Sequence, residues 1–457
     1  MNIILNTDSY KASHYLQYPK GTEHVFSYIE SRGGEYDHTV FFGLQAFIKE
    51  YLTKPITAAD INEAEEIFTL HGLPFNRAGW EHILNNHNGF LPIEINAVKE
   101  GTVVPVKNVL VTVVNTDPKL PWLTSYIETA LLRAIWYPTT VATISRSIKN
   151  IIKSRLEQTA DNIDGLAFKL HDFGARGVSS LESSAIGGAA HLVNFMGTDN
   201  VPALMFARKY YGENMAGFSI PAAEHSTITS WGKNHEKDAY ENMLTQFAKP
   251  GSLVAVVSDS YDLWNAISNI WGEALRQKVI DSGATVVIRP DSGNPADVVV
   301  HAAILLEAKF GCTLNKHGYK VLNNVRIIQG DGINEQSIKD ILARLMIAGY
   351  SADNVAFGMG GALLQHMNRD TQRFAMKASA IQIKGEWKDV FKDPITDPGK
   401  ASKKGRLMLY RDTTGKIYTA GFDEHCDLGE DLLLEGVYLN GVLLRDQSLK
   451  EIRELAK

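Results

Sequence analysis

Residues 285–295 read TVVIRPDSGNP, and this stretch contains the pattern that decides the fold. The run from Thr285 to Ile288 suits a buried strand, because valine and isoleucine are favoured inside sheets. Arg289, Asp291 and Gly293 end the strand, and ADVVVHAAILLEAKF follows with the pattern of an amphipathic helix. The stretch is therefore one β-α unit: an apolar strand, a polar stop and a helix.

The same unit recurs on both sides of this stretch. Its strand and stop are found in LAFKLHDFGARG, GFSIPAAEH, SLVAVVSDSYD, VRIIQGDG and NVAFGMGG, and a helical segment follows each of them. Strands that alternate with helices predict parallel pairing with right-handed crossovers. Because the unit recurs so often, a closed barrel is favoured over an open sheet, and we expect an irregular α/β barrel that resembles a TIM barrel.

The two ends of the chain differ from this middle region. HVFSYIES near the start reads as a strand, and RLMLYRDTTGKIYTA near the end reads as a hairpin. We therefore predict an N-terminal β-rich α+β domain over residues 1–145, the α/β barrel over 146–380, and a C-terminal segment over 381–457 that packs with the N-terminal domain. The helical stretch over 123–158 is expected to be interrupted at Pro138, since proline lacks the backbone N–H group.

Composition excludes several classes of protein. The 457 residues are 44% hydrophobic and carry a formal net charge of -6, which provides no basic field for nucleic acid. No stretch approaches the roughly 18 apolar residues of a membrane span, and the N-terminus has no signal-peptide pattern, so we expect a cytoplasmic protein. Cys312 and Cys426 have no metal-type spacing and are expected to be thiols. Zinc-protease, G-x-S-x-G and Walker A motifs are absent from the sequence.

Polar residues follow the predicted strands. In a parallel barrel the residues just after each strand gather at one face, where the active sites of such barrels lie. The residues expected at this mouth are His171, Asp172, Phe173, Arg176, Glu224, His225, Ser258, Asp259, Asp262, Arg289, Asp291, Gly330, Asp331, Gly360 and Gly361.

The order of the stops indicates a phosphorylated ligand. QGDG and GMGG are the last two stops, and barrels frequently bind phosphate on the loops after strands 7 and 8. Arg176 and Arg289 have the fork geometry for phosphate or a carbonyl. Asp291 and Asp331 suit sugar hydroxyls or a Mg²⁺ ion carried by phosphate. A phosphorylated sugar fits this set of residues.

Several residues also have a structural interpretation. Asp259 and Asp262 suit the N-caps of the following helices, and most phenylalanines fill cores, although Phe173 also suits stacking on a flat ring. His225 is compatible with capping a helix or with acting as an acid, base or nucleophile, and the sequence pattern leaves these open. The lysine-rich stretch FKDPITDPGKASKKGR has the composition of a solvated linker.

Longer strings in the chain resemble one family. NTDSYKASHY, KLHDFGARGVSS, HLVNFMGTDN, PAAEHSTITSWGKNHEKDA, VVSDSYD, IRPDSGNP, IQGDG, AFGMGG and VFKDPITDPGKASKKGR are similar to the motifs of the nicotinamide phosphoribosyltransferase family, in order, from Leu5 to about Arg453. The resemblance implies synthesis of nicotinamide mononucleotide and pyrophosphate from nicotinamide and 5-phosphoribosyl 1-pyrophosphate. It also implies a homodimer with active sites at the interface, ATP as a coupled co-substrate, and Mg²⁺ held mainly by the substrate pyrophosphate rather than by the protein.

The resemblance assigns five residues to nicotinamide. Phe173 and Tyr10 would sandwich the ring, with Tyr10 supplied by the neighbouring subunit and Asp8 at the same entrance. Asp199 would accept a hydrogen bond from the carboxamide NH2 group, and its charge would repel nicotinate. Arg289 would contact the carboxamide oxygen or the ribose-phosphate.

The other roles concern the phosphoribosyl group, pyrophosphate and ATP. Asp291 would orient the ribose or the Mg-pyrophosphate, and Asp331 with Gly330 would hold the ribose hydroxyls. His225 would be phosphorylated when ATP hydrolysis is coupled to synthesis, and His225, Arg289, Asp291 and Asp331 form the expected catalytic set. The remaining phosphoribosyl and pyrophosphate contacts are expected from Arg176, Ser258, Asp262, Gly360, Gly361, Arg369, Lys377, Lys392 and Lys400.

The chain departs from the family pattern at Met359, Ala362 and Ala175, which affects the shape of the phosphate loop and of the tunnel beside the ring. Two other functions stay open: a nicotinate-using relative, against which Asp199 argues, and a non-catalytic binding protein on the same scaffold.

Overall fold

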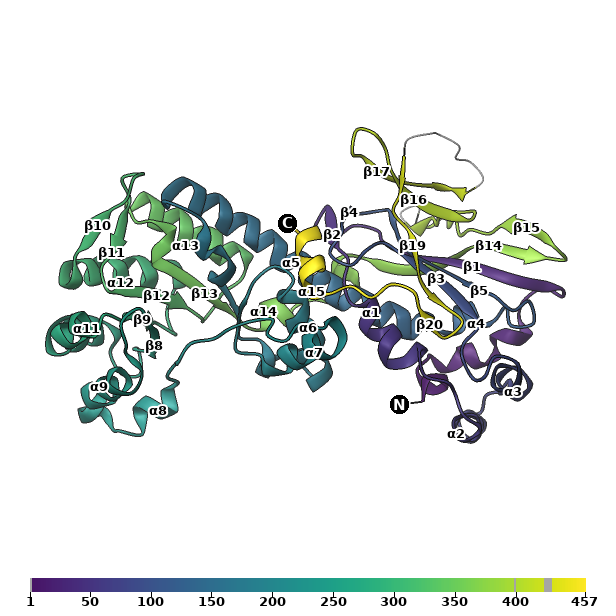
Figure 1. The fold of residues 1–457 in the computed structure, drawn as a ribbon, viewed down its shortest axis with the longest axis horizontal. Coiled ribbons are helices and arrows are strands. Elements are labelled where there is room, and N and C mark those ends of the chain that lie inside the picture. Colours follow the sequence, from purple (N-terminus) through teal and green to yellow (C-terminus); the bar gives the residue numbers. More distant parts are fainter. Residues whose placement is uncertain (1, 398–399, 423–429) are drawn as a thin grey trace. The chain divides into compact units, whose positions relative to one another are not determined.

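The computed structural model describes residues 2–397, 400–422 and 430–457 (Figure 1). The chain divides into two compact units. The first comprises Met1–Thr143, Ala207–Glu213 and Met367–Lys457, and the second comprises Ile144–Phe206 and Asn214–His366. Cys312 is a free thiol, whereas Cys426 lies outside the described residues.

The first unit is built on a seven-stranded sheet in the order β15-β14-β1-β5-β3-β19-β20, and its pairings are antiparallel. Its strands are β1 (Thr22–Ser31), β3 (Ile93–Ala97), β5 (Val109–Asn115), β14 (Phe374–Ile383), β15 (Glu386–Asp389), β19 (Glu435–Leu439) and β20 (Val442–Leu443). Two small sheets accompany it: β2 (His38–Val40) with β4 (Val103–Pro105), and β16 (Leu407–Arg411) between β17 (Ile417–Gly421) and β18 (Asp431–Leu432).

One large apolar core supports this unit. Strand and helix side chains such as Ile29, Ile95, Val111 and Trp80 are buried in it. Its helical segments are η1 (Ile3–Leu5), η2 (Ser9–Leu16), α1 (Leu44–Phe47), η3 (Ile48–Leu52), α2 (Ala58–Leu70), α3 (Arg77–Asn86), α4 (Leu123–Tyr126), η9 (Arg369–Thr371) and α15 (Leu449–Leu455).

Residues from both ends of the chain share this sheet. β14 pairs with β1, so that Lys377 lies opposite Tyr28 and Ala380 lies opposite Phe26. The boundary that the sequence placed at residues 380/381 therefore falls inside β14. Residues 367–380 belong to the first unit instead of the parallel-sheet unit.

The long helix α5 (Glu128–Thr159) runs without a break through Pro138, so the expected interruption there is wrong. Proline cannot bond the carbonyl four residues earlier. Gly43 lies against this turn, where a Cβ atom would be 2.5 Å from Pro138 Cγ and 2.7 Å from the Ala134 carbonyl oxygen. Thr140 and Thr143 donate side-chain hydrogen bonds to the carbonyls of Trp136 and Thr139 in the turns that follow.

The second unit contains a curled six-stranded parallel sheet in the order β7-β6-β13-β12-β9-β8 (Figure 1). Its strands are β6 (Leu170–Asp172), β7 (Gly197–Thr198), β8 (Leu253–Val257), β9 (Thr285–Arg289), β12 (Val325–Gln329) and β13 (Val355–Met359). The stretch TVVIRPDSGNP thus supplies β9, an inner strand that pairs with β8 on one side and β12 on the other. The mixed α/β class and the parallel pairing are confirmed.

The predicted strand GFSIPAAEH forms two isolated bridges instead of a regular strand. Thr198 N donates to Phe218 O at 3.0 Å on the β7 side, and Ala255 N donates to Pro221 O at 2.9 Å on the β8 side. Pro221 has no N–H group to continue a ladder. Ile220 packs against a small core cluster of Ala255, Val287 and Ile328, which come from three strands of the sheet. The stretch therefore bonds to both edge strands without being a strand itself.

Helices follow most strands of this unit, as the β-α pattern predicted. They are η4 (Asp164–Phe168), η5 (Ala175–Gly177), α6 (Leu181–His191), α7 (Val201–Tyr211, shared with the first unit), α8 (His225–Thr229), η6 (Lys233–His235), α9 (Glu236–Phe247), α10 (Leu263–Asn265), η7 (Ala266–Ala274), α11 (Arg276–Ser282), α12 (Pro295–Phe310), α13 (Glu335–Ile347), η8 (Ala352–Asn354) and α14 (Gly361–Leu364). A hairpin of β10 (Cys312–Leu314) and β11 (Lys320–Leu322) follows α12.

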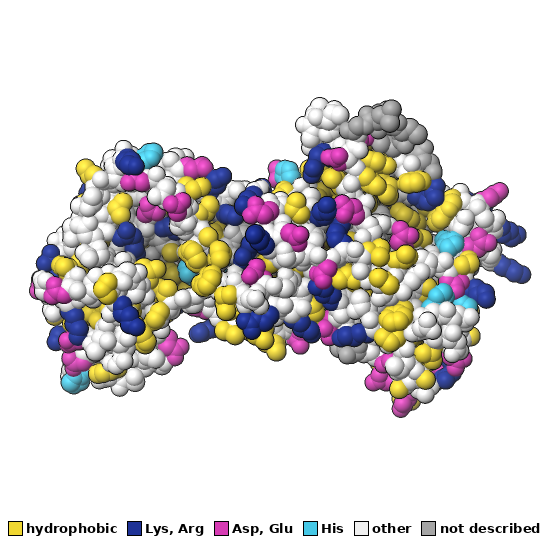
Figure 2. Space-filling model, in the orientation of Figure 1, with side chains coloured by type: hydrophobic (Ala, Val, Ile, Leu, Met, Phe, Trp, Pro, Cys, Tyr) yellow, Lys and Arg dark blue, Asp and Glu magenta, His cyan; other side chains and the backbone are white. Residues whose placement is uncertain are grey.

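Figure 2 shows positive and negative side chains interspersed over the visible face, in keeping with the small net charge of -6. Within the described ranges, none of the helices is both long and apolar enough to cross a membrane.

Candidate active site

A cavity of about 800 Å³ in the second unit is lined by residues that follow the parallel strands. β6, β9, β12 and β13 all end at this cavity, because parallel strands present their carboxyl ends at one face of a sheet. It brings together the predicted residues Phe173, Arg176, Asp199, His225, Arg289, Asp291, Gly330, Asp331, Gly360 and Gly361.

Phe173 is fixed at the end of β6 by the neighbouring strand. Its backbone N–H donates to Met359 O at 3.0 Å. Its ring lies over Gly358, where a Cβ atom would be only 2.0 Å from Phe173 Cε2. The Arg289 guanidinium carbon is 5.4 Å from the ring centroid. Any side chain at position 358 would therefore displace the aromatic ring from the cavity wall.

Asp172 ties the end of β6 to the loop that carries Asp199. Its carboxylate accepts bonds from Gly174 N at 2.7 Å and Asn200 Nδ2 at 2.8 Å, and its carbonyl accepts from Asp199 N at 3.1 Å. Burial raises the pKa of Asp172, the two hydrogen bonds from Gly174 and Asn200 lower it, and the negative charge of Asp199 raises it, so that the pKa lies at about 6. Asp199 Oδ1 accepts a bond from Ser219 Oγ at 2.5 Å, which fixes the carboxylate at the cavity.

Arg289 and Asp291 form an ion pair beside His225. Arg289 Nη2 is 2.9 Å from Asp291 Oδ1. The His225 Nε2 atom is 3.5 Å from Asp291 Oδ2 and 3.7 Å from Asp259 Oδ1. Its other ring nitrogen, Nδ1, lies 3.2 Å from Ser260 Oγ. The imidazole therefore has two carboxylates on one side and a hydroxyl on the other.

Asp259 supports the loop after β9. Its Oδ2 atom accepts bonds from Asp291 N at 3.1 Å and Ser292 Oγ at 2.6 Å. Its Oδ1 atom is buried and has no hydrogen-bond partner among the described residues. An unpaired buried carboxylate oxygen is costly, so a hydrogen-bond donor or a cation of a ligand would be stabilised beside it.

The glycine-rich stops form the other side of the cavity. Gly330 and Asp331 follow β12, and Gly360 and Gly361 lead from β13 into α14. Within the described chain, no side chain donates a hydrogen bond to the Asp331 carboxylate, which is exposed. This carboxylate and the glycine backbone are therefore accessible to a ligand with hydroxyl and phosphate groups.

Four residues predicted at the mouth do not line the cavity: His171, Ser258, Asp259 and Asp262. Ser258 is fully buried, accepts a bond from Trp271 Nε1 at 3.1 Å and donates to Val256 O at 2.9 Å. Asp262 is the N-cap of α10 and accepts bonds from Trp264 N and Asn265 N, both at 3.0 Å. The capping interpretation of Asp262 is thus the one that the hydrogen bonds support.

The three departures from the family pattern have different positions. Met359 is buried at the end of β13, whereas Ala362 and Ala175 line the cavity. Met359 therefore belongs to the core under the loop, and the two alanines leave space in the cavity wall.

A second cavity, of about 500 Å³, lies in the first unit and is lined mainly by cations. Its lining includes Arg369, Lys377, Lys392 and Lys400, so the lysine-rich stretch is part of a pocket wall. Burial lowers the pKa of Lys377, and the neighbouring cations Arg32, Lys11 and Arg369 lower this pKa further. Such a crowded group of positive charges favours a polyanionic ligand.

Asp8 and Tyr10 also lie in the first unit. Tyr10 is 57% exposed on η2 and makes an edge contact with His14. Asp8 Oδ2 accepts a bond from Thr129 Oγ1 at 2.6 Å, which holds the start of η2. Their predicted roles at nicotinamide stay predictions.

Several lining residues have no motif in the sequence that assigns them to a site. Asn334 and His366 line the cavity of the second unit, and Arg32 and Arg373 line the cationic pocket. His366 comes from the segment after α14 and Asn334 caps α13. Their positions depend on how loops fold back, and no local motif marks them.

The fold and the cavity define a class: two-unit α/β proteins with a ligand cavity at the carboxyl ends of a curled parallel sheet. Profiles of two families match the chain: the nicotinate phosphoribosyltransferase (NAPRTase) family over residues 168–427 and the nicotinamide phosphoribosyltransferase N-terminal domain over residues 2–95. The chain belongs to the nicotinate phosphoribosyltransferase family.

Two relatives named nicotinamide phosphoribosyltransferase match over nearly their whole length. The protein of Xanthomonas campestris is 59% identical over 457 residues, covering 99% of this chain and 97% of the relative. The protein of Acinetobacter baylyi is 34% identical over 493 residues, with the same coverage of 99% and 97%.

Two crystal structures share the fold. Nicotinate-nucleotide pyrophosphorylase from Pyrococcus furiosus has a TM-score of 0.62 at 16% identity and covers 100% of this chain and 95% of its own. Human nicotinic acid phosphoribosyltransferase has a TM-score of 0.58 at 16% identity, covering 98% and 92%. At this identity the likeness concerns the fold alone.

Proposed function

We propose that this chain is a nicotinamide phosphoribosyltransferase, which forms nicotinamide mononucleotide and pyrophosphate from nicotinamide and 5-phosphoribosyl 1-pyrophosphate. One observation carries the proposal: a single cavity combines Phe173, Asp199 and Arg289 with Asp331 and the Gly360–Gly361 turn. The first three suit an aromatic carboxamide, and the others suit a ribose phosphate. The 59% identity to the Xanthomonas protein of this name supports the same activity.

The reaction needs positioning more than proton transfer. The neutral ring nitrogen of nicotinamide forms a bond to ribose C1 while the C1–O bond breaks, and the electron pair leaves with pyrophosphate. Phe173 would orient the ring, and Asp199 would accept from the carboxamide NH2 group. Asp331 would hold the ribose hydroxyls, so that the two reactants meet in line. Carboxylates such as Asp291 would stabilise the positive charge that develops on the ribose.

Mg²⁺ fits the donors of this cavity. Asp331 has an exposed carboxylate without a hydrogen-bonded side chain among the described residues, and Asp291 lines the same cavity. Hard carboxylate oxygens together with phosphate oxygens are the ligands that Mg²⁺ prefers. When bound, the ion would neutralise charge on the leaving pyrophosphate.

We also propose that residues 217–223 close the curled sheet into an irregular barrel. The bonds from Phe218 to β7 and from Pro221 and Ala223 to β8 support this closure. The packing of Ile220 against side chains of β8, β9 and β12 supports it as well.

The cationic pocket of the first unit would receive pyrophosphate. We propose that it does so as part of a homodimer, in which the first unit of one subunit completes the cavity of its partner and supplies Tyr10. Six cations, Arg32, Arg369, Arg373, Lys377, Lys392 and Lys400, line that pocket beside only two acids, Asp370 and Asp397. The homodimer is proposed to act in the cytoplasm.

ATP is proposed as a co-substrate that phosphorylates His225. An N–P bond forms at the imidazole while the bond to the γ-phosphorus of ATP breaks and ADP leaves. The carboxylates of Asp259 and Asp291 lie on the Nε2 side and would hold a proton there, which leaves Nδ1 as the nucleophile. His225→Ala is expected to abolish ATP hydrolysis and to weaken nucleotide synthesis without eliminating it. His235→Ala, an exposed histidine on η6, is the matched control, and ATP hydrolysis retained by His225→Ala would contradict the role.

The function itself is tested by a product assay with nicotinamide, 5-phosphoribosyl 1-pyrophosphate and Mg²⁺. Nicotinamide mononucleotide and pyrophosphate are expected to form in equal molar amounts. A parallel reaction with nicotinate tests the nicotinate-using alternative. A lack of product with either base would favour the non-catalytic binding protein.

A further inference from the structure

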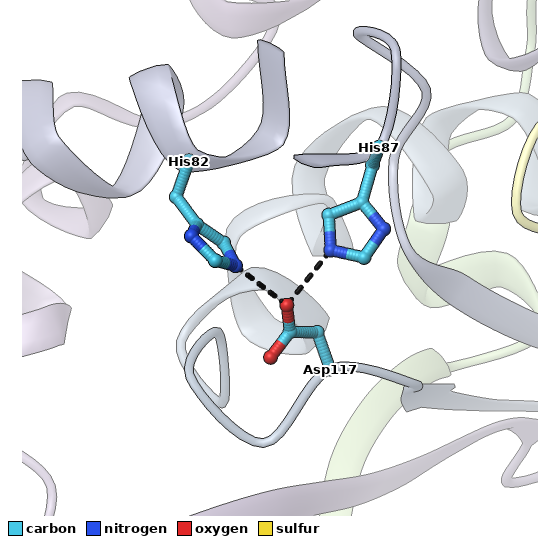
Figure 3. Close-up of side chains that lie close together, drawn as sticks. All are labelled: His82, His87 and Asp117. Atoms are coloured by element: carbon cyan, nitrogen blue, oxygen red, sulfur yellow. Dashed lines mark hydrogen bonds and ion pairs between the residues drawn. The ribbon is translucent and has the colours of Figure 1, made fainter. Parts of the chain in front are cut away.

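Two histidines and an aspartate meet in the first unit, apart from the lining of both cavities (Figure 3). His82 lies in α3, His87 is the C-cap of α3, and Asp117 follows β5. The side chains are 20%, 25% and 13% exposed, respectively. They are therefore held by the fold and still reachable from solvent.

Both imidazoles point to the same carboxylate oxygen (Figure 3). His82 Nε2 and His87 Nε2 each lie 2.7 Å from Asp117 Oδ2. The ring planes are inclined at 66° with centroids 5.6 Å apart. Three potential ligand atoms, all within 4.8 Å of one another, thus converge on one point.

The backbone holds these three side chains in place. Asp117 Oδ1 accepts a bond from Lys119 N at 2.8 Å, which orients the carboxylate so that Oδ2 faces the histidines. Asn115 Nδ2 donates to the Asp117 carbonyl at 2.8 Å, while Asn115 Oδ1 accepts from Val25 N in β1. His87 N donates to Ile83 O at 3.0 Å and closes the last turn of α3. The cluster is preorganised, and support of this kind raises metal affinity.

We propose that His82, His87 and Asp117 bind one divalent transition-metal ion of the zinc type, with water at the fourth position. Two imidazole nitrogens and one carboxylate oxygen are a zinc donor set, whereas Mg²⁺ requires mainly oxygen ligands. On binding, each neutral ring moves its proton from Nε2 to Nδ1, so that the Nε2 lone pair faces the metal. Tetrahedral zinc places neighbouring N and O ligands about 3.3 Å apart, so the cluster opens by about 0.6 Å.

The ion would connect α3 to the turn after β5. The two histidines are close along the chain, but Asp117 is 35 residues beyond His82 and 30 residues beyond His87. The unfolded chain does not hold these groups together, so binding favours the folded state and raises the melting temperature as the free zinc concentration rises. The site is structural and separate from the proposed reaction.

The test compares the metal-free full chain with the double variant His82→Gln/His87→Gln. Glutamine keeps an N–H donor in reach of Asp117 Oδ2 but is a poor zinc ligand, so the variant separates a hydrogen-bonded cluster from a metal site. His71→Gln, an exposed histidine just after α2, is the matched control. Circular dichroism verifies that each variant is folded.

Zinc content after dialysis against micromolar zinc with millimolar Mg²⁺ is the first measurement. The wild-type chain and His71→Gln are expected to retain one zinc equivalent more than the double variant. Zinc is expected to raise the melting temperature of these two proteins but not that of the double variant. X-ray absorption of the wild-type chain is expected to show two imidazoles and one carboxylate on zinc, a result that needs no variant. Equal zinc content in all three proteins, or a spectrum without two imidazole ligands, would overturn the proposal and leave a hydrogen-bonded cluster only.

Discussion

Arg289 and Asp291 form a forked ion pair between the end of β9 and the turn behind it. Arg289 Nη2 lies 2.9 Å from Oδ1 and 3.1 Å from Oδ2 of Asp291, and Arg289 Nε lies 3.2 Å from Oδ1. The sequence resemblance gave the two residues separate tasks, on the base or phosphate and on the ribose or metal. The pair makes these tasks interdependent, because each side chain fixes the orientation of the other.

This pairing predicts non-additive mutations. Asp291→Asn and Arg289→Gln are each expected to lower kcat/KM for 5-phosphoribosyl 1-pyrophosphate by about 100-fold, as removal of a transition-state contact does. The loss of kcat/KM in the double variant should be much smaller than the product of the two single losses, since either single change already disorders the ion pair. Steady-state kinetics test this, with the exposed Asp297→Asn as control, and strictly multiplicative losses would show that the residues act independently.

Asp199 is predicted to set the choice of base. Replacement with Asn would remove the charged hydrogen bond proposed to the carboxamide, which is worth about 10- to 100-fold in kcat/KM for nicotinamide. It also removes the repulsion of nicotinate, so the nicotinamide/nicotinate ratio of kcat/KM should fall. Ser219→Ala, which removes only the hydroxyl bonded to Asp199, is the milder control. An unchanged ratio in Asp199→Asn would assign the selectivity to other residues.

Asp172 predicts a pH-dependent stability. Burial raises its pKa to about 6, above the ordinary value of 3.8. Between these values the folded chain keeps a proton that the unfolded chain has released, so the free energy of unfolding falls as pH rises, by about 3 kcal/mol in total. The difference in unfolding free energy between wild type and Asp172→Asn should therefore be larger at pH 4 than at pH 7. Urea denaturation at both pH values tests this, and an equal difference would contradict the buried carboxyl.

A dimer with shared sites predicts complementation between variants of different units. Arg369→Ala changes the first unit and Arg289→Ala changes the second. Each homodimer should be nearly inactive. Random mixing makes about half of the dimers heterodimers, and each heterodimer has one intact site of two. The mixture should therefore recover about a quarter of the wild-type activity.

The control for this experiment is a mixture of two first-unit variants. Tyr10 and Arg369 both lie in the first unit, so Tyr10→Ala mixed with Arg369→Ala leaves no intact site and should not recover. Recovery in the control mixture, or none in the test mixture, would exclude a site built from opposite units of two subunits.

The sequence predicted the parallel sheet well because its signal is local. Each of β6, β8, β9, β12 and β13 is a short apolar run that ends in a polar stop. GFSIPAAEH was wrong as a regular strand, since Pro221 limits its backbone bonds to isolated bridges. The domain boundary near residue 380 could not be predicted because it depends on long-range pairing. The local sequence of β14 predicts a strand, but it does not show that this strand pairs with β1.

The candidate cavity was predictable for a similar reason. Residues after parallel strands must gather at one face, and this rule placed Phe173, Arg289 and Asp331 together. Helix caps are exceptions to this rule. Asp262 follows β8, but its carboxylate caps the N-terminus of α10 instead of lining the cavity. His366 and Arg373 reach their cavities through irregular segments, for which the sequence carries no periodic signal.

The most direct test of the central claim is a competition between the two bases in one reaction. Wild-type chain receives equal concentrations of nicotinamide and nicotinate with limiting 5-phosphoribosyl 1-pyrophosphate and Mg²⁺, and the two mononucleotides are quantified by chromatography. The proposed function predicts nicotinamide mononucleotide as by far the main product, because Asp199 is proposed to accept a hydrogen bond from the amide and to repel the acid. Nicotinate mononucleotide as the main product, or no mononucleotide at all, would contradict it.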